Sequence, residues 1–152
     1  RVTIPFNVAL PCRLFRASAN DVFARAFHTE RIMRLIIDLD GTICYLKEKH
    51  ETYADVKPKE GAAEFLRNLR KEGHYIIIQT ARNMATCEAN LGKVIKNVGK
   101  ITLEWLETHG IEYDEIYFGK PNGDLYIDDR ALRFEDWGSL SEDILKGLAR
   151  SK

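Results

Sequence analysis

The sequence predicts an α/β fold built around a mostly parallel sheet. Two observations carry that prediction. Short apolar runs of strand length alternate with longer stretches whose apolar residues recur at helical spacing. Polar residues directly follow the apolar runs, as expected where parallel strands end at a binding edge. The apolar runs are residues 35–37, 75–78, 115–119 and 125–127.

The first predicted strand, residues 35–37, is a short buried run that leads into Asp38-Leu39-Asp40-Gly41. Residues 43–57 are mostly polar and predict a surface excursion. A helix is expected next, because Pro58 suits a first helical turn and Gly73 suits a helix end. The apolar side chains between these two residues have helical spacing: Ala62, Phe65, Leu66 and Leu69.

The second predicted strand, at 75–78, leads into a long helical or partly helical stretch from about 84 to 109. We expect Gly92 and Gly99 to divide this stretch and Gly110 to end it. Its apolar face is supplied by Ile101, Leu103, Trp105 and Leu106.

Residues 115–119 and 125–127 are the third and fourth predicted strands, and a last helix is expected at 141–149 with Ser141 as its N-cap. A chain of this length has room for one ordinary domain, which we place at 33–152. Alternating strands and helices predict a three-layer, Rossmann-like arrangement with helices on the two faces of the sheet.

Four polar side chains are expected to gather at one edge of this sheet. Asp38, Thr80 and Asp128 end three of the predicted strands, and Lys120 follows the remaining one. Because parallel strands have their carboxyl ends at the same edge, these residues should lie close together.

Their chemistry suits a phosphate ester, which is anionic and repels anionic nucleophiles. An enzyme must neutralise such a substrate, align a nucleophile and protonate the leaving oxygen. Asp38 can attack phosphorus and form an acyl phosphate. Asp40 can protonate the leaving oxygen and later activate water. Gly41 allows the sharp turn after them and lets a substrate approach the backbone.

Two further groups and a metal complete this chemistry. Thr80 can donate a hydrogen bond to a phosphoryl oxygen, and Lys120 supplies a compact positive charge for the same group. Mg²⁺ takes hard oxygen ligands, so the Asp38 carboxylate together with Asp128 or Asp129 would suit it.

The chain resembles the haloacid dehalogenase (HAD) superfamily in the order and spacing of four motifs, over residues 33 to about 137. The motifs are Asp38-Leu39-Asp40-Gly41-Thr42, Thr80, Lys120 within Gly119-Lys120-Pro121, and Asp128-Asp129. The resemblance implies a HAD-like fold, with Asp38 as nucleophile and Asp40 as acid/base. It also implies that the Asp40 backbone carbonyl binds Mg²⁺, that Asp128 is a direct ligand, and that Asp129 lies beside it or binds through water.

A narrower similarity is to the small phosphatases encoded in bacterial capsule polysaccharide operons. It rests on Thr80-Ala81-Arg82-Asn83-Met84, Asn90-Leu91-Gly92-Lys93 and Tyr126-Ile127-Asp128-Asp129-Arg130. The implied substrate is a small phosphorylated sugar or polyol. Gly41, Thr42, Arg82 and Asn83 would then contact the substrate, although Arg82 and Asn83 could equally cap the helix that follows them.

No cap domain is expected, because neither 43–57 nor 81–119 can hold an independent domain. A capless site is open, so either its substrate is large or a neighbouring subunit covers it. We favour a homo-oligomer.

Residues 1–32 differ in composition from the rest of the chain. They contain five arginines and no lysine, and Met33 reads like a natural start. This extension resembles either an organelle transit peptide or translated upstream or cloning-derived sequence. The three cysteines form no C-x-x-C pair, which fits unpaired thiols in a cytoplasmic protein: Cys12, Cys44 and Cys87.

The balanced formal charge argues against nucleic-acid and membrane partners. Two alternatives to a sugar phosphatase remain. One is a polynucleotide or phosphoprotein phosphatase on the same fold. The other is a receiver-like phosphoacceptor domain, against which the order of the motifs argues, since receivers place their acidic pair before the phosphorylated aspartate.

Overall fold

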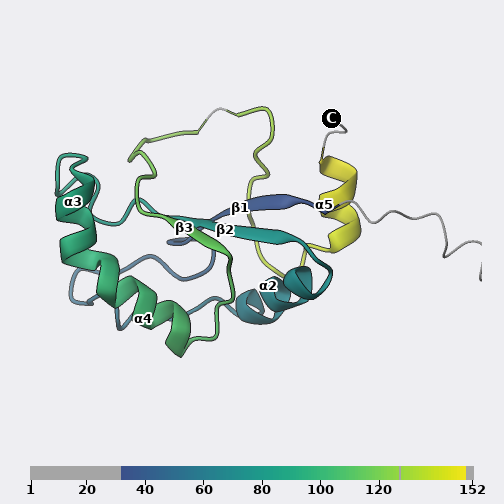
Figure 1. Ribbon diagram of the computed structural model, residues 1–152, viewed down its shortest axis with the longest axis horizontal. Coiled ribbons are helices and arrows are strands. Elements are labelled where there is room, and N and C mark those ends of the chain that lie inside the picture. Colours follow the sequence, from purple (N-terminus) through teal and green to yellow (C-terminus); the bar gives the residue numbers. More distant parts are fainter. Residues whose placement is uncertain (1–31, 127, 150–152) are drawn as a thin grey trace, which may run out of the picture. The chain divides into compact units, whose positions relative to one another are not determined.

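The computed structural model describes residues 32–126 and 128–149, and these residues form an α/β fold (Figure 1). Its sheet has three parallel strands in the order β1-β2-β3. The strands are β1 (Arg34–Asp38), β2 (Tyr75–Gln79) and β3 (Glu115–Tyr117), which lie at three of the four positions predicted from the sequence. The residues expected to form an N-terminal extension, 1–32, lie outside the described residues except for the last.

The sheet buries one face. Leu35 pairs with Ile76 and Ile37 with Ile78, so these four side chains point the same way because side chains alternate along a strand. Ile76 and Ile78 are fully buried in the main core. On the opposite face Ile36 stays 66% exposed.

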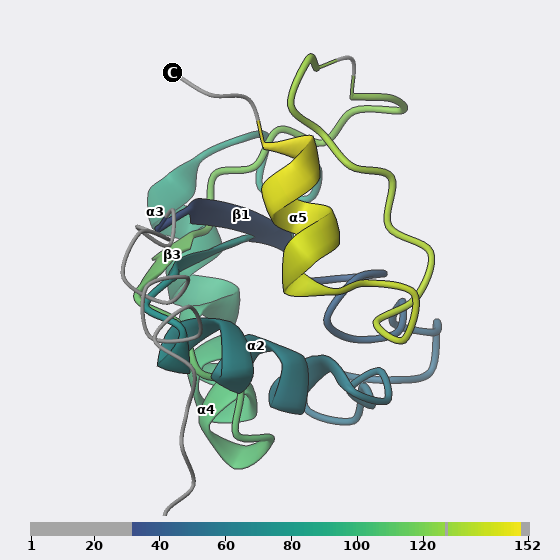
Figure 2. The same cartoon turned by 90° about the vertical axis from the view of Figure 1, so that its right-hand side faces the viewer.

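Helices α2 (Ala62–Lys71) and α4 (Lys100–Thr108) pack on the buried face, and Figure 2 shows both on the same side of the sheet. Their inward side chains form the main core with the β2 isoleucines: Leu66, Leu69, Trp105 and Leu106. The three-layer prediction is met in part. Helices cover one face of the sheet, but no described helix covers Ile36 on the other face.

Helix α2 begins four residues later than the sequence pattern predicted. Gly61, with φ +78°, is its N-cap, whereas Pro58 lies in a bridge with Cys44 that ties the excursion back to the turn after β1. Glycine tolerates this left-handed conformation, so the helix starts directly after Gly61, at Ala62, instead of at Pro58.

The long helical stretch runs from residue 91 to 108 in three consecutive parts. These are α3 (Leu91–Val94), the π-helical segment η1 (Ile95–Gly99) and α4. The predicted division at Gly99 coincides with the end of η1. Trp105 is buried as expected, but Leu103 is 43% exposed and Thr102 occupies the buried position on this face instead.

The fourth predicted strand is not formed by the described part of its segment. Residue 127 lies outside the described residues, and Leu125 and Tyr126 are 78% and 49% exposed without strand pairing. Within residues 32–126 and 128–149, β1 therefore pairs with β2 alone.

Helix α5 (Glu142–Leu148) lies beside β1 (Figure 2) and has the predicted Ser141 N-cap, whose hydroxyl accepts from the Ile144 N–H. A buried histidine ties it to the sheet. His74 Nδ1 accepts from the Met33 N–H, and its Nε2 contacts Glu142 Oε1 at 2.9 Å. Lys146 contacts the same carboxylate.

No helix in the described part of the chain is long and apolar enough to cross a membrane. Cys44 and Cys87 are buried free thiols, as expected, while Cys12 lies outside the described residues.

Glu142→Gln should destabilise the protein at neutral pH and have little effect in acid. The Lys146 hydrogen bond, and then the one with His74, hold the pKa of Glu142 below its usual 4.5. Its contribution is thus present above that value and lost as pH falls through the lowered one. We expect urea unfolding to give a loss of about 1 kcal/mol at pH 7, and this loss to shrink as the pH falls below 4.5.

Lys100→Gln is the matched control, because the Lys100–Glu104 pair is exposed on both sides. It should leave stability unchanged at both pH values. An equal loss for Glu142→Gln in acid and at neutral pH would contradict the role of its charge.

Candidate active site

Asp38 ends β1, and Asp40 follows two residues later in the turn after that strand. Leu39 between them is fully buried, and its N–H extends the ladder to the Gln79 carbonyl. The Leu39 carbonyl then accepts from the Ile43 and Cys44 N–H groups, which closes a tight turn. Two carboxylates are thus presented on one short, rigid segment.

Gly41 makes that turn. Its φ is +93°, and a Cβ added there would lie 3.4 Å from Leu46 Cδ2. A side chain in this conformation is strained whatever space surrounds it. The sequence-based prediction that Gly41 supplies a sharp turn is confirmed.

Lys120 reaches across the sheet edge to Asp38. Its Nζ donates to Asp38 Oδ1 at 2.7 Å, and the two side chains are 16% and 30% exposed. The Lys120 ammonium also lies 4.6 Å from the centre of the Tyr126 ring. A cation and a carboxylate therefore meet at the surface, where a small anion could reach them.

Thr80 links the other groups. Its N–H donates to the Tyr117 carbonyl, and its own carbonyl accepts from the Lys120 N–H. Its hydroxyl donates to Asp40 Oδ2 at 3.2 Å and accepts from the Arg82 N–H. Asp40, Thr80, Lys120 and Asp38 thus form one connected set. Three of its members, Asp38, Thr80 and Lys120, were expected there from the convergence of strand ends, whereas no described contact links Asp128 to the set.

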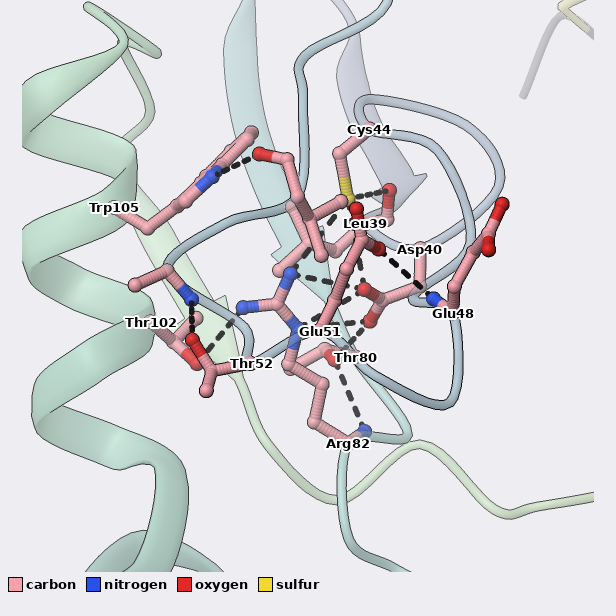
Figure 3. A network of polar contacts seen from close by, with 12 residues as sticks. Leu39, Asp40, Cys44, Glu48, Glu51, Thr52, Thr80, Arg82, Thr102 and Trp105 are labelled. Carbon is pink, nitrogen blue, oxygen red and sulfur yellow. Dashed lines mark hydrogen bonds and ion pairs between the residues drawn. The ribbon is translucent and has the colours of Figure 1, made fainter.

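Arg82 has a different place from the substrate contact or helix cap expected from the sequence. Its side chain has no exposed surface, and its guanidinium binds Asp40 through two nitrogens (Figure 3). Nε lies 3.0 Å from both carboxylate oxygens, and Nη2 lies 2.9 Å from Oδ1. A buried arginine with this geometry contacts Asp40 and not the solvent-facing part of the site.

The Asp40 charge also affects two neighbours. Burial, and then the nearby Asp40 carboxylate, raises the pKa of the Cys44 thiol from 9.0 to about 12. The same two causes raise the pKa of Tyr53 above its usual value. The Cys44 thiol therefore remains protonated at neutral pH and can donate to the Leu39 carbonyl and to Asp40.

The remaining candidate substrate residues are Thr42 and Asn83. Thr42 lies beside Asp38 in an apolar recess, and its carbonyl accepts from Trp137 Nε1. Asn83 has φ +57°, a conformation that asparagine tolerates better than most residues, and its carbonyl accepts from the Cys87 N–H. Asn83 therefore shapes the turn after β2.

The predicted metal ligands are not all brought together. Asp128 is exposed, and its Oδ1 accepts from the Arg130 N–H at 2.7 Å; Asp129 is exposed beside it. Within residues 32–126 and 128–149, no three His, Cys, Asp or Glu side chains are arranged to hold a metal ion. The partly exposed Asp38 carboxylate offers the hard oxygen that Mg²⁺ prefers, but the described positions of Asp128 and Asp129 do not complete the set.

A second recess adjoins the turn on the side of residues 43–57, the polar excursion between β1 and α2. Gly41 forms part of its wall, and the other lining residues mix aromatic, acidic and basic side chains: Tyr45, Leu46, Glu48, Glu51, Val56, Lys57 and Lys59. This recess differs from the one beside Asp38, where the described lining residues are apolar apart from Asp38 and Thr42.

Two residues at the site were missed from the sequence. Thr102 accepts from Arg82 Nη1 at 3.2 Å, and the Tyr53 ring lies 4.4 Å from the Arg82 guanidinium carbon. A signal existed for Thr102, which lies three residues before the buried Trp105 and so shares its helix face. The polar segment around Tyr53 carried no such signal.

No protein-family model and no curated protein matches the chain. Among solved structures, it is similar to the crystal structure of an MCSG target from Vibrio cholerae, with 39% sequence identity and a TM-score of 0.69. The match covers 78% of this chain and 96% of the Vibrio cholerae chain.

Gly41→Ala should destabilise the protein, because alanine at φ +93° is strained. We expect the free energy of unfolding in urea to fall by about 2 kcal/mol. Gly147→Ala is the opposite control. Gly147 lies within α5, and a Cβ there meets nothing within 4 Å, so alanine should stabilise by about 1 kcal/mol. Equal effects of the two substitutions would contradict the strained turn.

Proposed function

This chain belongs to one family with the Vibrio cholerae protein, and we propose that it is a Mg²⁺-dependent phosphomonoesterase that works through a phosphoaspartate at Asp38. One observation carries the proposal. The Lys120 ammonium contacts the partly exposed Asp38 carboxylate at the end of β1, while Asp40 follows two residues later and is linked to both through Thr80. The motif order adds the resemblance to HAD-superfamily phosphatases.

In the first half-reaction Asp38 is the nucleophile. A carboxylate oxygen of Asp38 forms a bond to phosphorus, and the bond from phosphorus to the leaving oxygen breaks with its electron pair on that oxygen. Asp40 supplies the proton that makes the leaving group an alcohol. Lys120 and the Thr80 hydroxyl would offset the negative charge of the phosphoryl oxygens.

In the second half-reaction Asp40 is the base. It takes a proton from water while the water oxygen bonds to phosphorus, and the bond from phosphorus to Asp38 breaks. Asp40 regains the proton that it gave up, and Asp38 regains its carboxylate. The net reaction converts a phosphate monoester and water into an alcohol and inorganic phosphate.

Mg²⁺ would be held by the Asp38 carboxylate and the Asp40 carbonyl, and Asp128 and Asp129 would have to move from their described positions to complete the set. Bound there, it would neutralise charge on the phosphoryl group. The support for it is the chemistry of the donor set and the resemblance to the superfamily.

The proposed substrate is a small phosphorylated sugar or polyol of the kind used in capsule polysaccharide biosynthesis. Besides the sequence resemblance, the recess next to Gly41 favours it. Tyr45 offers an aromatic surface there, while Glu48 and Lys59 offer an acceptor and a donor for hydroxyl groups. A panel of sugar, polyol and nucleoside monophosphates tests this choice, and a preference for nucleotides would overturn it.

Asp38→Asn should abolish phosphate release, because an amide cannot serve as the nucleophile. We expect turnover of 4-nitrophenyl phosphate with Mg²⁺ to fall by about 10³-fold or more. Asp143→Asn, an exposed aspartate on α5, makes the same chemical change away from the site and should retain full activity. Excess chelator should abolish turnover by the wild type. Undiminished turnover in Asp38→Asn, or in chelator, would rule out the mechanism.

Asp40→Asn should slow hydrolysis of the phosphoenzyme more than its formation, because 4-nitrophenolate leaves without needing a proton. Acid quenching during turnover, followed by mass spectrometry, should find phosphate on Asp38 in a large fraction of the variant. The wild type should show much less under the same conditions. A variant that never carries phosphate would contradict the role of Asp40 in the second step.

A further inference from the structure

The Arg82 guanidinium is enclosed by groups from three separate parts of the chain. Thr102 of α4 accepts from Nη1, and the Tyr53 ring of the polar excursion lies 4.4 Å from the guanidinium carbon. Trp105 is held in place by a 2.7 Å hydrogen bond to the Val56 carbonyl, and its ring centre lies 5.9 Å from the same carbon. Figure 3 shows the guanidinium between Thr102 and Asp40.

This enclosure determines which groups the Arg82 guanidinium can contact. The side chain has no exposed surface, and its remaining nitrogen contacts lead to Asp40 and to Cys44 Sγ. A fork-shaped guanidinium that meets both oxygens of a carboxylate restrains its rotation as well as its position.

Asp40 keeps one side open despite these contacts. Its side chain is 21% exposed, whereas that of Arg82 is 0% exposed. Asp40 can therefore reach a leaving oxygen or a water, and Arg82 cannot. The Thr80 hydroxyl, which also donates to Asp40 Oδ2, adds a second restraint from the end of β2.

We propose that Arg82 is a positioning residue, held by Thr102 and Tyr53, that orients the Asp40 carboxylate for proton transfer. The inference rests on the proposed function and adds a residue to it. It replaces the substrate contact expected from the sequence with an indirect role, and the two roles differ in which kinetic constant they affect.

Arg82→Gln tests the proposal with 4-nitrophenyl phosphate as the substrate. We expect kcat to fall by about 100-fold with KM unchanged, because misplacing a reacting group costs rate and not binding. Acid-quenched phosphoenzyme on Asp38 should rise toward the level of Asp40→Asn, since the second step needs Asp40 more than the first. Arg82→Lys should recover only part of the rate, because lysine lacks the fork.

Two further variants separate positioning from stability. Arg70 pairs with Asp114 and Glu112 on the surface, and Arg70→Gln should leave kcat per folded molecule and the phosphoenzyme level unchanged. Thr102→Val keeps Arg82 but removes one of its acceptors, so it should lower kcat in the same manner by a smaller factor. If Arg82→Gln does not fold, Thr102→Val replaces it in the test. Its kcat, KM and phosphoenzyme level are then measured, with kcat and phosphoenzyme normalised to the folded fraction.

Four outcomes would overturn the inference. A raised KM at constant kcat would assign Arg82 to substrate binding. A fall in kcat without a rise in the phosphoenzyme level would leave Arg82 with a structural role. A wild type that forms no phosphoenzyme and releases no phosphate from any ester would remove the proposed function and the inference together. If the wild type is active and the Arg82 variants match it, only the inference fails.

Discussion

Parallel pairing of β1, β2 and β3 is the constraint on which the site depends. The register places Asp38 beside Gln79 and Gln79 beside Tyr117, so the three carboxyl ends are level. Backbone hydrogen bonds continue past the strands, from Leu39 to β2 and from Lys120 to Thr80. Each polar group of the site is therefore held within three residues of a strand end, and a buried layer of leucine and isoleucine side chains supports the strands from one face.

Two ion pairs at this edge have different surroundings. The Lys120–Asp38 pair is partly exposed on both sides, so a phosphate could compete for the lysine and reach the carboxylate. The Arg82–Asp40 pair is closed on the arginine side, where no ligand can replace the guanidinium. Such a division suits one carboxylate that changes its bonding during the proposed reaction and another whose orientation must persist. Thr80 connects the two pairs through its backbone and its hydroxyl.

Most of the fold could be predicted because its elements have strong local signals. The isoleucine-rich runs became strands, the apolar spacing around Leu66 became α2, and Ser141 caps α5 as expected. The predicted elements differ from the observed ones where contacts with other parts of the chain outweigh the local sequence signal. Helix α2 does not begin at Pro58, as predicted, but directly after Gly61, which has a positive φ. Residues 125–126 have strand-like composition but lie exposed without a strand partner. Three residues offer few hydrogen bonds, so composition alone is a weak guide for so short a segment.

The sequence by itself determined which chemical groups stand at the sheet edge. Strand-terminal positions follow from the apolar runs, and these positions identify Asp38, Thr80 and Lys120, with Asp40 two residues beyond Asp38. Only the tertiary structure decided which groups Arg82 contacts. Its partners come from the turn after β1, the polar excursion and α4, and nothing in its own neighbourhood along the chain encodes their meeting. A guanidinium so far from solvent needs acceptors and aromatic faces already in place around it, and those are assembled only when the chain has folded.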